Sequence, residues 1–177
     1  MKFALTYIVL LFLLASPCIA QNMPASDPPV SQSQLDLFLG SWTGSGYYEG
    51  DGKKWEFTMK FSGKSIVNGK AIEIDPSADV KDMGPYREKV CLPWDPMLEQ
   101  VTMLTVSSFG EVGKYTGDWV VGTKTTLKLQ ESKVVNNDRF DVEHTLIFHD
   151  GNKLLWRAIS TKNGGAMGTY EGTFTKR

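Results

Sequence analysis

The chain has 177 residues, which is enough for one domain, and its formal net charge at pH 7 is −1. Nucleic-acid-binding domains usually carry a basic patch or stripe. Here the lysines and arginines are scattered without a run, so the composition argues against a nucleic-acid partner.

The N-terminus predicts an export signal. A lysine at position 2 precedes the apolar run "FALTYIVLLFLLA", whose length of about a dozen residues suits a signal peptide and is too short for a membrane span. Cleavage after Ala20 would define residues 1–20 as the signal peptide and send the protein to the periplasm or the medium. A lipoprotein modified at Cys18 is the alternative, although Pro17 fits it badly. No second long apolar run follows, so no membrane span is expected.

The next segment, residues 21–33, holds three prolines and almost no bulky apolar side chains, which predicts a disordered leader. Ser33 is expected to cap a short helix, because Asp36 three residues later gives a weak capping-box match. Gly40 is expected to end this helix. Residues 34–177 are expected to form a single domain.

From Ser41 onward the hydrophobic pattern changes from a helical period to strict alternation. Apolar residues occupy every second position in the run from Trp55 to Phe61, and the same pattern recurs in Tyr115–Val121, Phe140–Phe148 and Leu154–Ala158. Asn-Gly and Asp-Gly turn signals separate the runs. This arrangement predicts an all-β, antiparallel meander of eight to ten strands. Closure into one up-and-down barrel would hide the sheet edges, and a two-sheet sandwich is the alternative.

The stretch "FLGSWTGSGYY" places Trp42 among glycines directly after the predicted helix. If the sheet closes, the indole lies on the first strand, below a helix that crosses one end of the barrel, and it can fill that end. The neighbouring glycines let other backbone segments come close and let the strand bend. Packing therefore explains this motif without any chemistry.

The stretch "LDLFLGSWTGSG" resembles the opening of the lipocalin and fatty-acid-binding superfamily, in which a short helix precedes Gly-x-Trp. In that superfamily a late basic residue packs over the tryptophan, and the resemblance offers this role to Lys176, Arg177 or Arg157. The stretches "LGSWTGSGYYEGDGKKWEFTMKFSGKSIVNGKAIEID", "GPYREKVCLPWDPMLEQVTMLTVSSFGEVGKYTGDW" and "GTYEGTFTKR" are similar to a bacterial family of exported lipocalin-like proteins of unknown function. The resemblance implies a calycin-like barrel and brings no catalytic residues.

The sequence contains no motif typical of an enzyme or a metal site. It has no Gly-x-Ser-x-Gly elbow, and Cys91 has no local catalytic partner. Cys91 is interpreted as a small buried residue of a strand. His144 and His149 lie five positions apart on a predicted strand, so they point to opposite faces and cannot share an ion. We therefore expect no catalysis, metal or cofactor.

His144 shares its predicted strand face with apolar residues, so it should point into the barrel. It is interpreted either as a neutral core histidine with one hydrogen bond or as a polar group that orients a ligand. The second interpretation includes a ligand to haem iron. The chain resembles nitrobindin-like haem barrels in its Gly-x-Trp-x-Gly first strand, but its middle strands depart from that pattern.

An apolar chamber with a few polar groups is the usual binding site for a small molecule. The inward-facing candidates for such a chamber are Trp42, Trp55, Phe57, Phe61, Trp119, His144, Trp156 and Tyr170. The sequence thus favours an exported, non-catalytic β-barrel that binds a small apolar or amphipathic ligand. The alternatives are a filled barrel that acts as a structural or protein-interaction module, and a haem-binding, nitrobindin-like barrel that uses His144.

Overall fold

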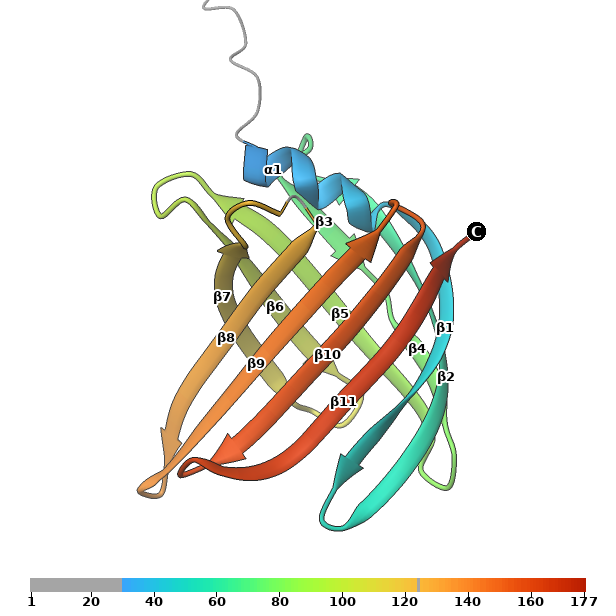
Figure 1. Cartoon of the computed structure of the whole chain (residues 1–177), viewed down its shortest axis with the longest axis vertical. Helices are drawn as coiled ribbons and strands as arrows, with labels where there is room; N and C mark the ends of the chain where they lie inside the picture. The colour runs from blue at the N-terminus through green and yellow to red at the C-terminus, as the bar shows by residue number, and fades with distance from the viewer. Residues whose placement is uncertain (1–29, 124) are drawn as a thin grey trace, which may run out of the picture.

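The computed structural model describes residues 30–123 and 125–177, in which a short helical segment precedes eleven strands (Figure 1). The helical segment comprises α1 (Val30–Gln34) and the 3₁₀ turn η1 (Leu35–Phe38). The strands are β1 (Gly40–Gly50), β2 (Lys53–Ile66), β3 (Ala71–Ile74), β4 (Ser77–Val80), β5 (Gly84–Asp95), β6 (Gln100–Ser107), β7 (Val112–Trp119), β8 (Thr126–Val135), β9 (Asp138–His149), β10 (Lys153–Lys162) and β11 (Gly165–Lys176). The predicted signal peptide lies outside the described residues.

The strands form one closed antiparallel ring. β1 pairs with β11 on one side and with β2 on the other, which closes the sheet. β3 and β4 both lie between β2 and β5, so they are two halves of one interrupted strand. The eleven strands therefore occupy ten positions around the ring. The predicted all-β, up-and-down barrel is confirmed, and the two-sheet sandwich is excluded because no free sheet edge separates two layers.

The local sequence explains both the tight turns between strands and the interruption between β3 and β4. Asp51 and Gly52, which join β1 to β2, have φ values of 51° and 70°, and this left-handed backbone suits a tight Asp-Gly hairpin. Asp150 and Gly151 do the same between β9 and β10. Pro76 has no N–H to donate to a sheet ladder, and it stands where β3 ends and β4 begins.

The helical segment covers one end of the barrel, which we call the closed end (Figure 1). Trp42 is 1% exposed there, and its indole stacks on Phe61 at 5.7 Å between ring centroids. The indole N–H donates a hydrogen bond to the Phe38 carbonyl oxygen at 3.2 Å. A Cβ at Gly63 would collide with that same carbonyl group, so glycine permits the close approach of η1 to β2. Trp42 thus closes this end, as the sequence predicted.

The late basic residue over Trp42 is Lys176. Its Nζ lies 5.5 Å from the centre of the indole ring, and residues 42 and 176 are paired across β1 and β11. Arg157, by contrast, points outward and forms a long ion pair with Glu171 at 3.9 Å. The structure therefore selects Lys176 from the three residues that the resemblance offered.

Two local predictions were wrong. Ser33 lies inside α1 rather than at its N-cap, because the helix already begins at Val30, within the predicted leader. Cys91 lies in β5 as expected, but it points outward, is paired with Glu73 of β3, and is only half-buried. Its inward neighbours on the strand occupy the core positions instead.

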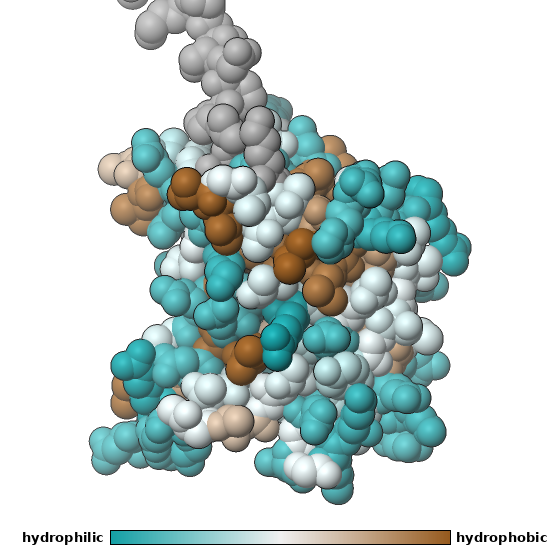
Figure 2. Space-filling view, in the orientation of Figure 1, coloured by the Kyte–Doolittle hydropathy of each residue, from teal (hydrophilic) through white to brown (hydrophobic). Residues whose placement is uncertain are grey.

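The outer surface is mixed in character. Figure 2 shows a mostly hydrophilic face over β8 to β11, on which hydrophilic side chains separate the hydrophobic patches. None of the helices in the described part of the chain has the length and hydropathy needed to cross a membrane.

Candidate functional site

The inward side chains are fully buried at the closed end and less completely buried at the opposite end, which we call the open end. Near the helical segment, the inward side chains of Leu146, Phe148 and Leu154 are at most 1% exposed. Farther along the same strands, the inward residues Ala158 and Ser160 are only half-buried. Sheet neighbours flank both residues on β9 and β11. The inward face of the open end is therefore less completely covered than that of the closed end.

A belt of rings lies on the inner wall of the open end. Tyr115 of β7 contacts His144 of β9 edge-on, at 4.5 Å between ring centroids. His144 lies 6.0 Å from Trp156 of β10, which lies 6.0 Å from Tyr170 of β11. Tyr170 in turn stacks on Phe57 of β2 at 5.1 Å. These five residues form the aromatic belt, which follows the inner wall across the closure of the barrel.

One hydrogen bond within the belt determines the chemical state of His144. The indole N–H of Trp156 donates to His144 Nδ1 at 3.0 Å. An indole nitrogen can only donate, so Nδ1 must be unprotonated, and the neutral ring carries its proton on Nε2. Burial lowers the pKa of His144 to about 4, which keeps the ring neutral at physiological pH. Nε2 is buried and has no hydrogen-bond partner among the described residues.

The facing wall carries an acidic group that the sequence analysis missed. Glu88 of β5 is half-buried and is paired across the sheet with Ser107 of β6. Burial raises the pKa of Glu88, while hydrogen bonds from the hydroxyl groups of Tyr86 and Thr105 act in the opposite direction. Within the described residues, no basic side chain forms an ion pair with Glu88. Glu88 lies two positions from both Tyr86 and Val90 on the same strand, so alternation places the three side chains on one face and could have predicted that Glu88 points inward.

The hydroxyl groups of Tyr115 and Tyr170 at the open end remain protonated. Burial raises the pKa of Tyr115 to about 12, with a smaller contribution from Glu131. Burial also raises the pKa of Tyr170, whose hydroxyl group lies 3.9 Å from the Met59 sulfur. The wall therefore offers neutral hydroxyl groups beside its aromatic surfaces.

The predicted cavity residues all face inward, but they divide between the two ends of the barrel. The open end contains Trp55, Phe57, His144, Trp156 and Tyr170, and the closed end contains Trp42, Phe61 and Trp119. Trp55 is half-buried and stacks on Tyr48 at 5.6 Å near the mouth of the barrel. The residues of the closed end pack on one another and fill that end of the barrel, so they do not belong to the candidate site at the open end.

The His144 arrangement does not fit a ligand to haem iron. A neutral imidazole that binds iron through Nε2 carries its proton on Nδ1. In this barrel that proton would point at the Trp156 N–H, which is also a donor. No group of three or more histidine, cysteine, aspartate or glutamate side chains in the described part of the chain is placed to hold a metal ion.

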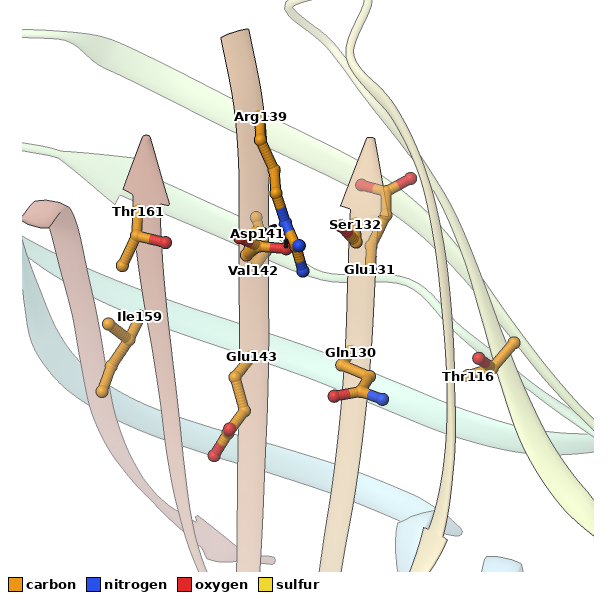
Figure 3. A pocket seen from close by; sticks show the side chains of 10 residues that line it. All are labelled: Thr116, Gln130, Glu131, Ser132, Arg139, Asp141, Val142, Glu143, Ile159 and Thr161. Carbon is orange, nitrogen blue, oxygen red and sulfur yellow. Dashed lines mark hydrogen bonds and ion pairs between the residues drawn. The ribbon is translucent and has the colours of Figure 1, made fainter. Parts of the chain in front are cut away.

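A hollow of about 520 Å³ lies on the outer face of β7 to β10 (Figure 3). Several of its charged side chains are already paired. The Arg139 guanidinium donates to Asp141 at 3.0 Å, and Glu143 accepts a hydrogen bond from Lys128 at 3.4 Å. This hollow is broad and is lined by exposed ion pairs, so it provides few unpaired groups for a ligand. The interior of the open end is the stronger candidate.

No family model and no curated protein matches the chain. Among solved structures, it is similar to Rv2717c from M. tuberculosis, with a TM-score of 0.61, 15% identity, and coverage of 84% of this chain and 98% of that chain. It is also similar to the S-type phycobiliprotein lyase CPES from Guillardia theta, with a TM-score of 0.58, 12% identity, and coverage of 82% and 92%. At these identities the likeness concerns the fold alone, which is a lipocalin-like closed barrel.

Proposed function

We propose that the protein is an exported, non-catalytic binding protein that holds one small amphipathic molecule in the open end of its barrel. The observation that carries this proposal is the incomplete burial of the inward residues Ala158 and Ser160, on the strand that also carries Trp156 of the aromatic belt. A barrel of eight strands can be filled by its own side chains, whereas additional strands leave room inside. The ring of ten positions supports a hollow interior.

The wall chemistry supports an amphipathic ligand. Trp156, Tyr170 and Phe57 offer aromatic surfaces on one side. Glu88 and the neighbouring hydroxyl groups offer polar contacts on another side, as is common in small-molecule sites. A ligand with an aromatic or apolar body and a polar substituent matches both surfaces.

The state of His144 supports binding rather than catalysis. A general base works best with a pKa near the operating pH. The pKa of His144 is lowered to about 4, and its Nδ1 already accepts a hydrogen bond from Trp156. The ring is therefore held as a fixed neutral group. Export, the remaining part of the proposal, rests on the apolar run and the cleavage site of the N-terminal sequence.

Titration of the purified protein with the neutral fluorescent dye Nile red tests the proposal. We expect saturable binding of one dye per chain. Ala158→Phe should weaken it at least about tenfold, because the added ring occupies the interior of the open end. Ile159→Phe is the matched control, since residue 159 lies on the same strand and points outward.

This control variant should bind the dye as the unmodified protein does. An unsaturable signal in the unmodified protein would contradict the proposal. Equal binding by the two phenylalanine variants would contradict the location of the site.

A further inference from the structure

The unpaired N–H of His144 points to a specific ligand group. Leaving a buried donor without an acceptor costs about 1–3 kcal/mol, and native structures rarely do so without a reason. Nε2 is the distal nitrogen of the imidazole ring, so it extends farther from the strand than Nδ1. Nδ1 is occupied by Trp156, whereas Nε2 has no acceptor among the described residues.

The surroundings of His144 distinguish this donor from the other unpaired one. Trp94 Nε1 is also buried without a partner among the described residues, but Trp94 lies at the closed end, where its backbone N–H donates to the carbonyl oxygen of Lys70, the residue after the one that Gln32 of α1 contacts. His144 lies in the aromatic belt at the open end, and its sheet partner Ala158 is one of the inward residues there that are only half-buried. The unpaired donor and the space that a ligand would occupy therefore belong to the same part of the barrel.

The charges at the open end indicate which kind of hydrogen-bond acceptor could bind next to His144. The His144 ring is neutral, so it offers a hydrogen bond without a positive charge. Glu88 lies on the facing wall without a basic partner among the described residues, and Glu111 is close enough to raise the pKa of Glu88. Glu131 of β8 acts on Tyr115 in the same way. An anionic acceptor would meet these carboxyl groups at a cost, whereas a neutral oxygen would not.

We propose that His144 selects the ligand by donating its Nε2 proton to a neutral carbonyl oxygen on an otherwise aromatic or apolar molecule. This inference rests on the proposed function and adds the ligand class to it. Trp156 acts as the positioning residue, because its N–H determines which ring nitrogen carries the proton. The aromatic belt supplies the surface against which the body of the molecule lies.

A matched pair of probes tests the inference. The ketone 6-propionyl-2-(dimethylamino)naphthalene has a carbonyl acceptor, and 2-(dimethylamino)naphthalene is its parent without the ketone. The unmodified protein should bind the ketone at least about tenfold more tightly than the parent, since a buried donor then gains its partner. The emission of the bound ketone should also lie to the red, as it does when its carbonyl accepts a hydrogen bond.

Variants of His144 then assign the effect to this residue. His144→Phe should bind the two probes equally and shift the ketone emission to the blue. His144→Gln, which retains a side-chain N–H, should recover part of the preference. Val142→Ala is the matched control, because residue 142 is the next inward position on β9 and has no polar side-chain atom. It should keep the preference for the ketone.

Failure of this inference is distinguishable from failure of the proposed function. Equal affinity of the unmodified protein for the two probes would overturn the carbonyl selection, even if Nile red binds. Unchanged preference in His144→Phe would also overturn it. Absence of binding by all three probes would overturn the proposed function as well. The preference of the unmodified protein is a valid test even if a His144 variant fails to fold.

Discussion

The two ends of the barrel are built from the same strands, yet they differ in packing. On β9, Leu146 and Phe148 are at most 1% exposed, whereas Val142 and His144 are half-buried. The difference follows from what covers each end. The helical segment and Trp42 cover the closed end, so its inward side chains lose contact with water. Alternation along a strand therefore determines which side chains face inward, and the cover at each end of the barrel determines how completely they are buried.

The largest expected effect concerns the residue that closes the barrel. Trp42→Ala should lower the free energy of unfolding by about 3–5 kcal/mol, as expected for a fully buried aromatic side chain. Trp55→Ala is the counterpart near the open mouth, and it should cost about 1 kcal/mol because Trp55 is half-buried and stacks on one ring. Urea denaturation followed by circular dichroism measures both. Equal losses would show that the two ends are packed alike.

The pH dependence of the free energy of unfolding tests the burial of His144 at the open end. The pKa of His144 is lowered from 6.5 to about 4 by burial, so the folded state holds the ring neutral while the unfolded state protonates it. This contribution to stability is complete above the unfolded pKa, and it is lost as the pH falls from about 6.5 toward about 4. The expected loss is roughly 3 kcal/mol across this interval.

Comparison of the unmodified protein with His144→Gln isolates this contribution, because glutamine does not titrate. The free energy of unfolding should be measured by urea denaturation at several pH values between 7 and 4 for both proteins. The difference between them should change over this pH interval. A constant difference would indicate that His144 has an ordinary pKa and is more solvated than the structure implies.

The smallest expected effect concerns the cation over Trp42. Lys176→Met should lower the free energy of unfolding by about 0.5–1 kcal/mol, because it removes the ammonium group 5.5 Å from the indole and keeps most of the apolar stem. Lys153→Met on β10 is the control, since Lys153 is exposed and its ammonium group lies over no aromatic ring of the described residues. Equal effects of the two substitutions would show that the Lys176 ammonium group does not stabilise the closed end through the indole of Trp42.

Particular residues show how far sequence reasoning reached. Alternation correctly placed Phe57, His144 and Tyr170 on the inner face, because the side-chain period of a strand is independent of its neighbours. The same rule places Glu88 on the inner face. The sequence analysis considered only Cys91 on that strand, and Cys91, three positions farther on, faces outward. Ser33 was misassigned because capping signals locate a helix start only to within a few residues.

Sequence alone determined the all-β class, the turns, the inward set of side chains and the role of Trp42 at one end. Each of these depends on local period, on turn chemistry or on a motif. Tertiary structure alone decided how completely each inward residue is buried, since that depends on ring closure and on the helical cover. It also decided the tautomer of His144, because the Trp156 N–H reaches His144 from a neighbouring strand, twelve positions along the chain.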